Sequence, residues 1–150
     1  MSELDPVTVA RILVDALEAA SIPYAVGGAL AYGYWGPPRG TQDVDLNVFL
    51  GPDRAEGAFD VLAGAGMSFD RGAARQAVAE GGHVRGFVGR TPVDVFFDSI
   101  PLHEAAAARA LSRPMLGRPA RVLSAEDIVL FKMLFHRPKD LFDVERLVPS

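Results

Sequence analysis

The chain has 150 residues, the length of one domain, and its hydrophobic (49%) and charged (23%) fractions are those of a globular protein rather than a disordered or fibrous one. It contains no cysteine, which excludes disulfide frameworks and thiolate zinc sites, so any metal must be held by oxygen or imidazole. No apolar run is long enough to span a membrane, and the start, M-S-E-L-D-P, lacks the pattern of a signal peptide. We therefore expect one domain over residues 1–150, cytoplasmic and without a membrane partner.

The net charge of −4 is unevenly distributed. Residues 1–70 carry three arginines against ten acids, whereas residues 71–121 carry eight arginines against four acids. An arginine-rich stretch suits phosphate, because the guanidinium group matches two phosphate oxygens at once. A solvated basic surface explains the same charges equally well.

In the first half of the chain, Asp5-Pro6 is a good helix start, and apolar residues at helical spacing predict a helix over residues 6–20. A short buried strand is expected at 24–26. Gly27-Gly28 ends it, and a second helix is expected to open at 29–32. A strand then follows from residue 43, and residues 52–63 have a helical pattern.

In the second half, glycines interrupt residues 64–82, where we expect a strand near 67–69 and a helix over 73–79. Residues 84–88 and 93–97 predict a β-hairpin. A helix over 102–111, a strand at 120–123, a helix capped by Ser124 and Asp127 that runs to 135, and a last helix over 138–148 complete the prediction. This mixed order indicates an α+β or layered α/β fold, with a small mixed β-sheet flanked by helices.

Residues 39–49, R-G-T-Q-D-V-D-L-N-V-F, place two carboxylates in an otherwise apolar strand. Because strand side chains alternate between faces, Asp43 and Asp45 point one way while Val44, Leu46 and Val48 point to the core. Two like charges this close repel, so a bound cation is the most economical explanation, and paired oxygens suit Mg²⁺ or Mn²⁺.

A second apolar strand, P-V-D-V-F-F, is interrupted in the same way by Asp94. If it lies beside the first, three carboxylates meet on one face of the sheet, as a site for two divalent ions in phosphoryl transfer requires. The alternative is that each aspartate ends a strand near a turn and is simply solvated.

Other residues are expected to share a cleft with these acids. Gly27-Gly28, between a strand and a helix, lets backbone N–H groups approach an anion, although two glycines also serve a tight turn. Arg39 and Thr41 directly precede the acids, and a loop charge that balances the acids is an equal alternative for Arg39. Lys132 lies in the apolar run I-V-L-F-K-M-L-F, where it either reaches solvent or reaches toward a triphosphate. No H-E-x-x-H or G-x-S-x-G motif supports a zinc hydrolase or an esterase.

Taken together, V-G-G-A-L-A-Y-G-Y-W-G-P-P-R-G-T-Q-D-V-D-L resembles the first motif of the nucleotidyltransferase superfamily, and most closely the small bacterial proteins related to AbiEii-type toxins. The segment L-S-A-E-D-I-V-L-F-K-M-L-F-H-R-P-K-D-L-F-D-V-E is similar to that group's closing motifs. The resemblance implies a polymerase-β-like core with nucleotide phosphates on Gly27 and Gly28 and divalent metal on Asp43, Asp45 and Asp94. It also gives nucleotide-binding roles to Arg39, Thr41 and Lys132, and matches the closing K-D-x-x-D to Lys139, Asp140 and Asp143. Many relatives carry Gly-Ser in the glycine turn, whereas this chain has Gly28-Ala29, which offers backbone groups alone.

The implied activity is Mg²⁺- or Mn²⁺-dependent transfer of a nucleoside monophosphate from a nucleoside triphosphate to an acceptor hydroxyl, on RNA or tRNA, a protein or a small molecule, in a toxin–antitoxin or defence setting. Asp43, Asp45 and Asp94 are the expected catalytic residues. The alternative is an inactive module of the same fold that binds nucleotide, nucleic acid or a partner protein. With no room for a helical acceptor domain, we expect the arginine-rich stretch, a partner protein or a second copy of the chain to present the acceptor.

Overall fold

The computed structural model describes residues 5–27, 43–80, 83–97 and 106–135, with Pro52 and residues 131–135 described by their backbone alone. The helices are α1 (Pro6–Ala19), α3 (Ala55–Gly64), α4 (Arg71–Ala79) and α6 (Ala125–Phe135), with a short 3-10 turn, η1 (Pro52–Arg54). The strands are β1 (Tyr24–Gly27), β2 (Val44–Val48), β3 (His83–Val88), β4 (Thr91–Phe97), β5 (Leu111–Met115) and β6 (Arg118–Val122). The helices expected at 29–32 and 138–148 lie outside the described residues.

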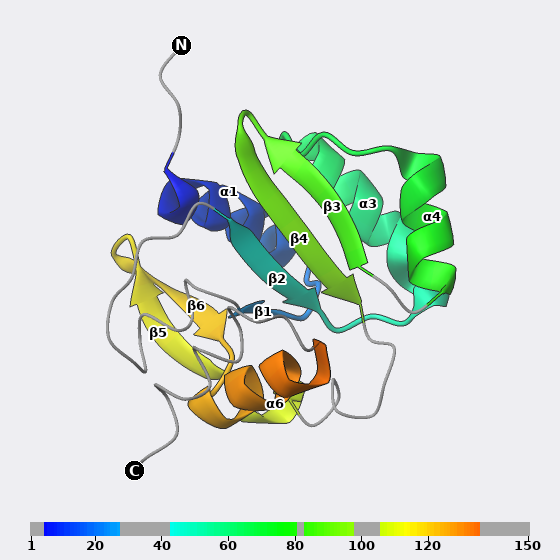
Figure 1. The fold of residues 1–150 in the computed structure, drawn as a ribbon. Coiled ribbons are helices and arrows are strands. Elements are labelled where there is room, and N and C mark those ends of the chain that lie inside the picture. Colours follow the sequence, from blue (N-terminus) through cyan, green and yellow to red (C-terminus); the bar gives the residue numbers. More distant parts are fainter. Residues whose placement is uncertain (1–4, 28–42, 81–82, 98–105, 136–150) are drawn as a thin grey trace.

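The six strands form one mixed sheet in the order β3-β4-β2-β1-β6-β5. Strand β2 pairs antiparallel with β1 and parallel with β4, and β1 pairs parallel with β6. The two edges of the sheet are the antiparallel hairpins β3-β4 and β5-β6. Helices α1 and α3 lie side by side behind the sheet in Figure 1, and α6 follows β6. This confirms the predicted α+β fold with a small mixed sheet flanked by helices.

Alternation along the central strands gives the sheet two different faces. The apolar residues of β2 and β4 share one face and are almost completely buried: Val44, Leu46, Val48, Val93, Val95 and Phe97. These residues belong to the same core cluster as Leu13 and Val14 of α1 and Phe59 of α3. The ring of Phe59 lies 5.7 Å from that of Phe97, edge to face. The core therefore fixes which way every side chain of β2 and β4 points.

Side-chain caps start the helices where the sequence predicts. Asp5 accepts a hydrogen bond from the backbone N–H of Thr8 at 2.8 Å, and Pro6 is the first helical residue of α1. Ser124 and Asp127 cap α6, because the backbone N–H of Asp127 donates to Ser124 Oγ and the Ser124 hydroxyl donates to Asp127 Oδ2. The predicted cap of that helix is confirmed. These side chains satisfy backbone N–H groups in the first turn of each helix, which have no partner within the helix.

The helix predicted over 102–111 is wrong at its end, because the chain is helical at 106–109 and Leu111 already begins β5. Sequence patterning missed β5, whose residues L-S-R-P-M lack the usual alternation and include Pro114. An edge strand tolerates proline because one side of its backbone needs no partner. The turn between β5 and β6 uses Leu116 and Gly117 at φ 52° and 82°, the left-handed conformation typical of two-residue hairpins.

The strand expected near 67–69 is reduced to one bridge. The backbone N–H of Ser68 donates to the carbonyl of Phe87 at 2.7 Å, and that of Phe87 donates back at 3.0 Å. This bridge covers part of the outer edge of β3. Among the described helices, none combines the length and apolar character needed to cross a membrane.

Candidate active site

The pairing of β1, β2 and β4 brings Asp45 next to both Asp94 and Gly27. Asp45 of β2 stands directly opposite Asp94 of β4 and, on its other side, opposite Gly27 of β1. Directly paired residues point to the same face of a sheet, at Cα separations of about 4.5–5.5 Å. Asp45 and Asp94 therefore share one face with the end of β1, as the sequence predicts.

Asp43 joins this face by alternation, two residues before Asp45. Asp43 directly precedes Val44, the first residue of β2, and its side chain is partly exposed. We call the face that carries Asp43, Asp45 and Asp94 the acid face. The opposite face is the buried apolar one, so the acids cannot rotate to the other side without pulling Val44 and Leu46 out of the core.

Asp94 is the most buried of the three acids, at 3% exposure. Its Oδ2 accepts a hydrogen bond from Arg85 Nη1 of β3 at 3.2 Å. Its Oδ1 is buried and has no hydrogen-bond partner among the described residues, although His83 Nε2 lies 3.4 Å away. A buried carboxylate oxygen without a donor is costly, so this atom points to a ligand.

Arg85 also approaches the second strand of the acid face. Its Nη2 lies 3.9 Å from Asp43 Oδ2, so one guanidinium group spans the carboxylates of Asp43 and Asp94. His83 lies beside it on β3, and its ring is stacked on that of Phe96 at 4.9 Å between centroids. Hairpin register accounts for both positions, because Arg85 pairs with Asp94 and His83 with Phe96.

Gly27 is confined by its neighbours. A Cβ atom at this position would lie 2.8 Å from Asn47 Nδ2, closer than real Cβ contacts, and 3.1 Å from Leu123 Cδ1, a tight contact. Asn47 lies on the acid face two residues after Asp45 and is buried. A side chain at this position would have to displace Asn47 or Leu123, so local packing favours glycine.

The remaining sequence-predicted site residues are less fully placed. Gly28, Arg39, Thr41, Lys139, Asp140 and Asp143 lie outside the described residues. The backbone of Lys132 lies in α6, seven residues into that helix, and its side chain is outside the description. The nucleotide-binding roles of these residues stay predictions.

The three acids share a face but do not form a closed metal cage in this conformation. Within residues 5–27, 43–80, 83–97 and 106–135, no group of three or more carboxylate or imidazole side chains is close enough to hold a metal ion. The donor set itself fits a hard divalent cation, since it offers carboxylate oxygens, and one of them is buried without a donor.

Comparisons with solved structures agree with this fold. The chain superposes on the antibiotic-resistance factor ANT(2'')-Ia with a TM-score of 0.67 at 17% identity, covering 94% of this chain and 81% of that one. That protein has also been solved in complex with adenylyl-2''-tobramycin, and this structure matches with a TM-score of 0.63 at 18% identity over 94% of this chain and 86% of that one. This protein has the nucleotidyltransferase fold. No family model and no curated protein matches the sequence.

Two further nucleotidyltransferase structures support the same assignment. The lincosamide antibiotic adenylyltransferase LnuA, with lincomycin bound, matches with a TM-score of 0.60 at 13% identity over 93% of this chain and 94% of that one. A nucleotidyltransferase-like protein from Paracoccidioides brasiliensis matches with a TM-score of 0.65 at 19% identity over 97% of this chain and 78% of that one. The resemblance of the sequence to the superfamily is therefore confirmed at the level of the nucleotidyltransferase fold. The closer likeness to AbiEii-type proteins stays a prediction.

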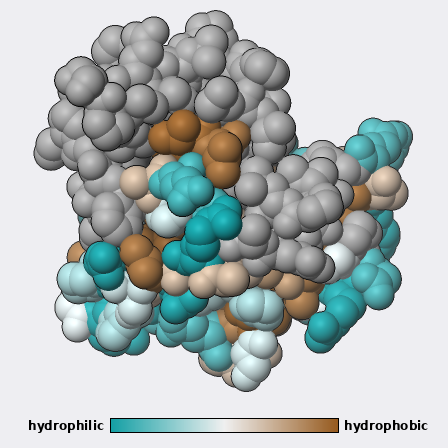
Figure 2. All heavy atoms as spheres, turned by 90° about the horizontal axis from the view of Figure 1, so that it is seen from below, coloured by the Kyte–Doolittle hydropathy of each residue, from teal (hydrophilic) through white to brown (hydrophobic). Residues whose placement is uncertain are grey.

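The arginine-rich stretch of this nucleotidyltransferase fold is largely paired within the protein. Five of its eight arginines form ion pairs with described acids: Arg71 with Asp60, Arg75 with Glu56, Arg85 with Asp94, Arg109 with Asp127 and Arg118 with Asp15. On the face seen in Figure 2, hydrophilic and hydrophobic side chains are interleaved among the described residues. These pairs favour a structural role for most of the arginines over a phosphate-binding patch.

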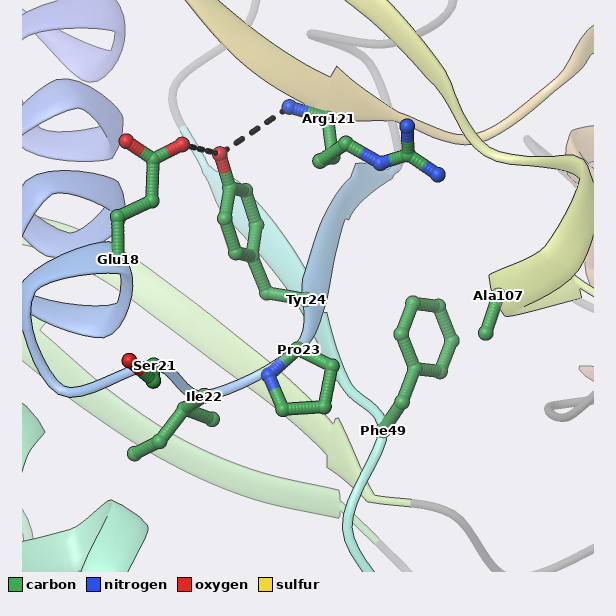
Figure 3. A pocket seen from close by; sticks show the side chains of 8 residues that line it. All are labelled: Glu18, Ser21, Ile22, Pro23, Tyr24, Phe49, Ala107 and Arg121. Atoms are coloured by element: carbon green, nitrogen blue, oxygen red, sulfur yellow. Dashed lines mark hydrogen bonds between the residues drawn. The ribbon is translucent and has the colours of Figure 1, made fainter.

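A cavity of about 570 Å³ lies at the other end of β1 from Gly27, lined in Figure 3 by Glu18, Ser21, Ile22, Pro23, Tyr24, Phe49, Ala107 and Arg121. The Tyr24 hydroxyl donates to Glu18 Oε2 and accepts from the backbone N–H of Arg121 at 3.1 Å. Burial, with the hydrogen bond to Glu18, raises the pKa of Tyr24 far above its usual value, so the phenol is neutral and is not a base. The acid face, rather than this cavity, is the candidate active site.

Arg85 and His83 were missed by sequence reasoning, although a signal was present. The hairpin turn at Gly89-Arg90 has two residues, and a two-residue turn fixes the pairing of all positions before and after it. Counting back from that turn pairs Arg85 with Asp94. Sequence patterning identified the two strands but not this register.

Proposed function

We propose that this protein is a Mg²⁺- or Mn²⁺-dependent nucleotidyltransferase that moves a nucleoside monophosphate from a nucleoside triphosphate to an acceptor hydroxyl. The observation that carries the proposal is the register of Asp45 with Asp94 and Gly27, together with the orphaned Oδ1 of Asp94. The nucleotidyltransferase fold of the neighbouring structures supports it.

Asp43, Asp45 and Asp94 would hold the divalent ions. When bound, these ions would neutralise the negative charge on the attacking and leaving oxygens. The fit rests on the hardness of the donors and on the buried oxygen that lacks a donor. We assign Asp94 a second role, to accept the proton of the acceptor hydroxyl, because its carboxylate is a base on the acid face.

Asp45 lies between Asp94 of β4 and Gly27 of β1, and the triphosphate binds on the β1 side, over the end of that strand. Gly27 and Gly28 present backbone N–H groups to its phosphates, Arg39 and Thr41 contact it from the segment before Asp43, and Lys132 reaches it from α6. An in-line displacement needs the acceptor and the pyrophosphate on opposite sides of the α-phosphorus. The acceptor therefore approaches from the β4 and β3 side, next to Asp94.

For the acceptor we favour a small molecule with hydroxyl groups, because two of the similar structures hold antibiotics: adenylyl-2''-tobramycin in ANT(2'')-Ia and lincomycin in LnuA. RNA or tRNA and protein acceptors are the other classes, and the likeness to AbiEii-type proteins adds a toxin–antitoxin setting in the cytoplasm. A second copy of the chain or a partner protein would complete the acceptor site.

The test is incubation with each α-labelled nucleoside triphosphate, Mg²⁺ or Mn²⁺, and one acceptor class at a time: total RNA, cell protein, and a panel of hydroxyl-bearing small molecules including antibiotics. We expect label in one class, lost in Asp45→Asn. Asp53→Asn is the matched control, because Asp53 is an exposed acid outside the acid face. Label that persists in Asp45→Asn, or transfer without divalent metal, contradicts the proposal.

The second candidate is a binding module of the same fold without transfer activity. The absence of a closed three-ligand group among the described residues and the Gly28-Ala29 turn favour it. Calorimetry separates the two functions: a module binds nucleotide with Mg²⁺ but labels no acceptor class, whereas the enzyme does both.

A further inference from the structure

Arg85 occupies an unusual position for a residue outside the core. It lies on β3 with its side chain 48% exposed, yet its guanidinium contacts both a partly exposed acid and an almost fully buried one. The contacts are 3.2 Å from Nη1 to Asp94 Oδ2 and 3.9 Å from Nη2 to Asp43 Oδ2. The β3-β4 hairpin itself is paired through its backbone from His83 and Phe96 to Val88 and Thr91.

The same two carboxylates are the ones that a divalent ion on the acid face requires. A guanidinium and a metal cannot use the same oxygens at once, because each needs the lone pairs directed at it. We propose that Arg85 competes with the divalent metal for Asp43 and Asp94, so that metal binding displaces the guanidinium from the acid face. This inference rests on the proposed function, whose metal ligands it uses.

The competition explains why the acids share a face without forming a metal cage. When no metal is bound, the guanidinium of Arg85 spreads a positive charge over Asp43 and Asp94, which offsets part of the repulsion between these two carboxylates. Arg85 bonds to Asp94 Oδ2, whereas Asp94 Oδ1 has no hydrogen-bond partner among the described residues, although His83 Nε2 lies 3.4 Å from it. That oxygen is free to take the first metal bond, after which Arg85 must release Oδ2 and Asp43.

Once displaced, Arg85 stays tethered to β3 at the side from which the acceptor approaches. The released guanidinium then offers its N–H donors next to the attacking hydroxyl. The exchange removes the contacts with Asp43 and Asp94, while the cation remains on the neighbouring strand β3.

The test is equilibrium binding of Mn²⁺, followed by the electron paramagnetic resonance of the free ion, to the full chain and to Arg85→Gln. An exposed ion pair is worth up to about 1 kcal/mol, and Arg85 makes two contacts, so its loss tightens Mn²⁺ binding by roughly tenfold. Arg85→Lys retains the charge, but a single ammonium group cannot span both acids, and we expect an affinity between those of the other two proteins.

Arg90→Gln is the control, because it removes the same charge from the same hairpin, five residues away at the turn. It should change the affinity by less than about twofold, since exposed charges beyond about 8–10 Å are screened at physiological salt. Equal or weaker Mn²⁺ binding by Arg85→Gln, or an equal gain in Arg90→Gln, overturns the competition. If neither the natural chain nor Arg85→Gln binds Mn²⁺, the metal-dependent function itself fails along with the inference. If both bind with one affinity, the competition alone is refuted.

Discussion

Arg11 offers the sharpest test of how this fold is held together. The side chain is 5% exposed and lies on α1, where its Nη1 donates to the carbonyl oxygens of Met115, Arg118 and Pro119 at 3.1–3.2 Å. Its Nε and Nη2 contact Asp15 at 3.0 and 2.7 Å. One guanidinium therefore joins α1 to the β5-β6 hairpin and saturates carbonyls around its turn. We predict that Arg11→Met destabilises the protein severely.

The magnitude follows from these contacts. Methionine keeps the length and apolar stem of the side chain but leaves the carbonyls and part of Asp15 without a donor. Breaking a buried charged group away from its partners costs about 3–5 kcal/mol. For a domain of this length each kcal/mol lowers Tm by roughly 2–4 °C, so Arg11→Met should lower Tm by about 6–20 °C. That loss is a large part of a typical total stability of about 5–15 kcal/mol.

The assay is urea unfolding followed by far-ultraviolet circular dichroism, with calorimetry for Tm. Arg118→Gln is the matched control, because Arg118 also pairs with Asp15, at 2.7 Å, but its side chain is 61% exposed. It should cost at most about 1 kcal/mol. Hydrogen exchange in Arg11→Met should show the β5-β6 amides opening first. A loss below about 1 kcal/mol in Arg11→Met, or one no larger than that of Arg118→Gln, refutes the reasoning.

Three further predictions concern stability. Gly86→Ala should lower the free energy of unfolding by about 1–3 kcal/mol, because the new Cβ would lie 2.5 Å from the backbone oxygen of Ser68. Gly57→Ala, with open space around it in α3, should raise that free energy by about 0.5–1 kcal/mol. Urea midpoints that move in the same direction in both variants contradict this. Asp127→Ala should lower stability by about 3–5 kcal/mol, because Asp127 is fully buried and bonds to Arg109 and Ser124. Ser124→Ala should lower it by about 1 kcal/mol. A calorimetric loss in Asp127→Ala that is no larger than that of Ser124→Ala would argue against the prediction. Burial raises the pKa of Asp15, but hydrogen bonds from Arg118 and Arg11 outweigh it, so the pKa lies below its ordinary value of 3.8. The stability from Asp15 is then fully present above that value and lost as the pH falls through the lowered pKa, so the Tm difference between the natural chain and Asp15→Asn should shrink toward acid pH; a constant difference from pH 7 to about pH 3 contradicts the assignment.

Local patterns determined most of the elements and the polarity of the sheet. The alternation D-V-D-L-N-V assigned Val44, Leu46 and Val48 to the core, and the structure buries all three. This works because a strand has a period of two, so one buried residue fixes its neighbours. The caps at Asp5 and Ser124 were readable for a related reason, since a capping side chain bonds to a backbone group only three residues away.

Patterns of this kind did not reveal the contacts that join distant segments. Helical spacing predicted α1 but not which of its side chains are buried: Ile12 and Ala16 are only partly buried. Arg11 is buried because carbonyls of a hairpin more than 100 residues later accept hydrogen bonds from its guanidinium. Strand β5 was missed because an edge strand with Pro114 is stabilised by its partner rather than by its own residues.

The acid face divides in the same way between sequence and structure. The sequence by itself determined that Asp43 and Asp45 share a face and identified both strands of the β3-β4 hairpin, but the two-residue turn at Gly89-Arg90 that sets Arg85 opposite Asp94 came from the structure. Only the tertiary structure decided that β4 lies parallel to β2 and brings Asp94 beside Asp45, and hence that Arg85 spans two acids. Parallel pairing needs a long connection, and its register is set by the packing of the whole core rather than by any turn, so no local signal encodes it.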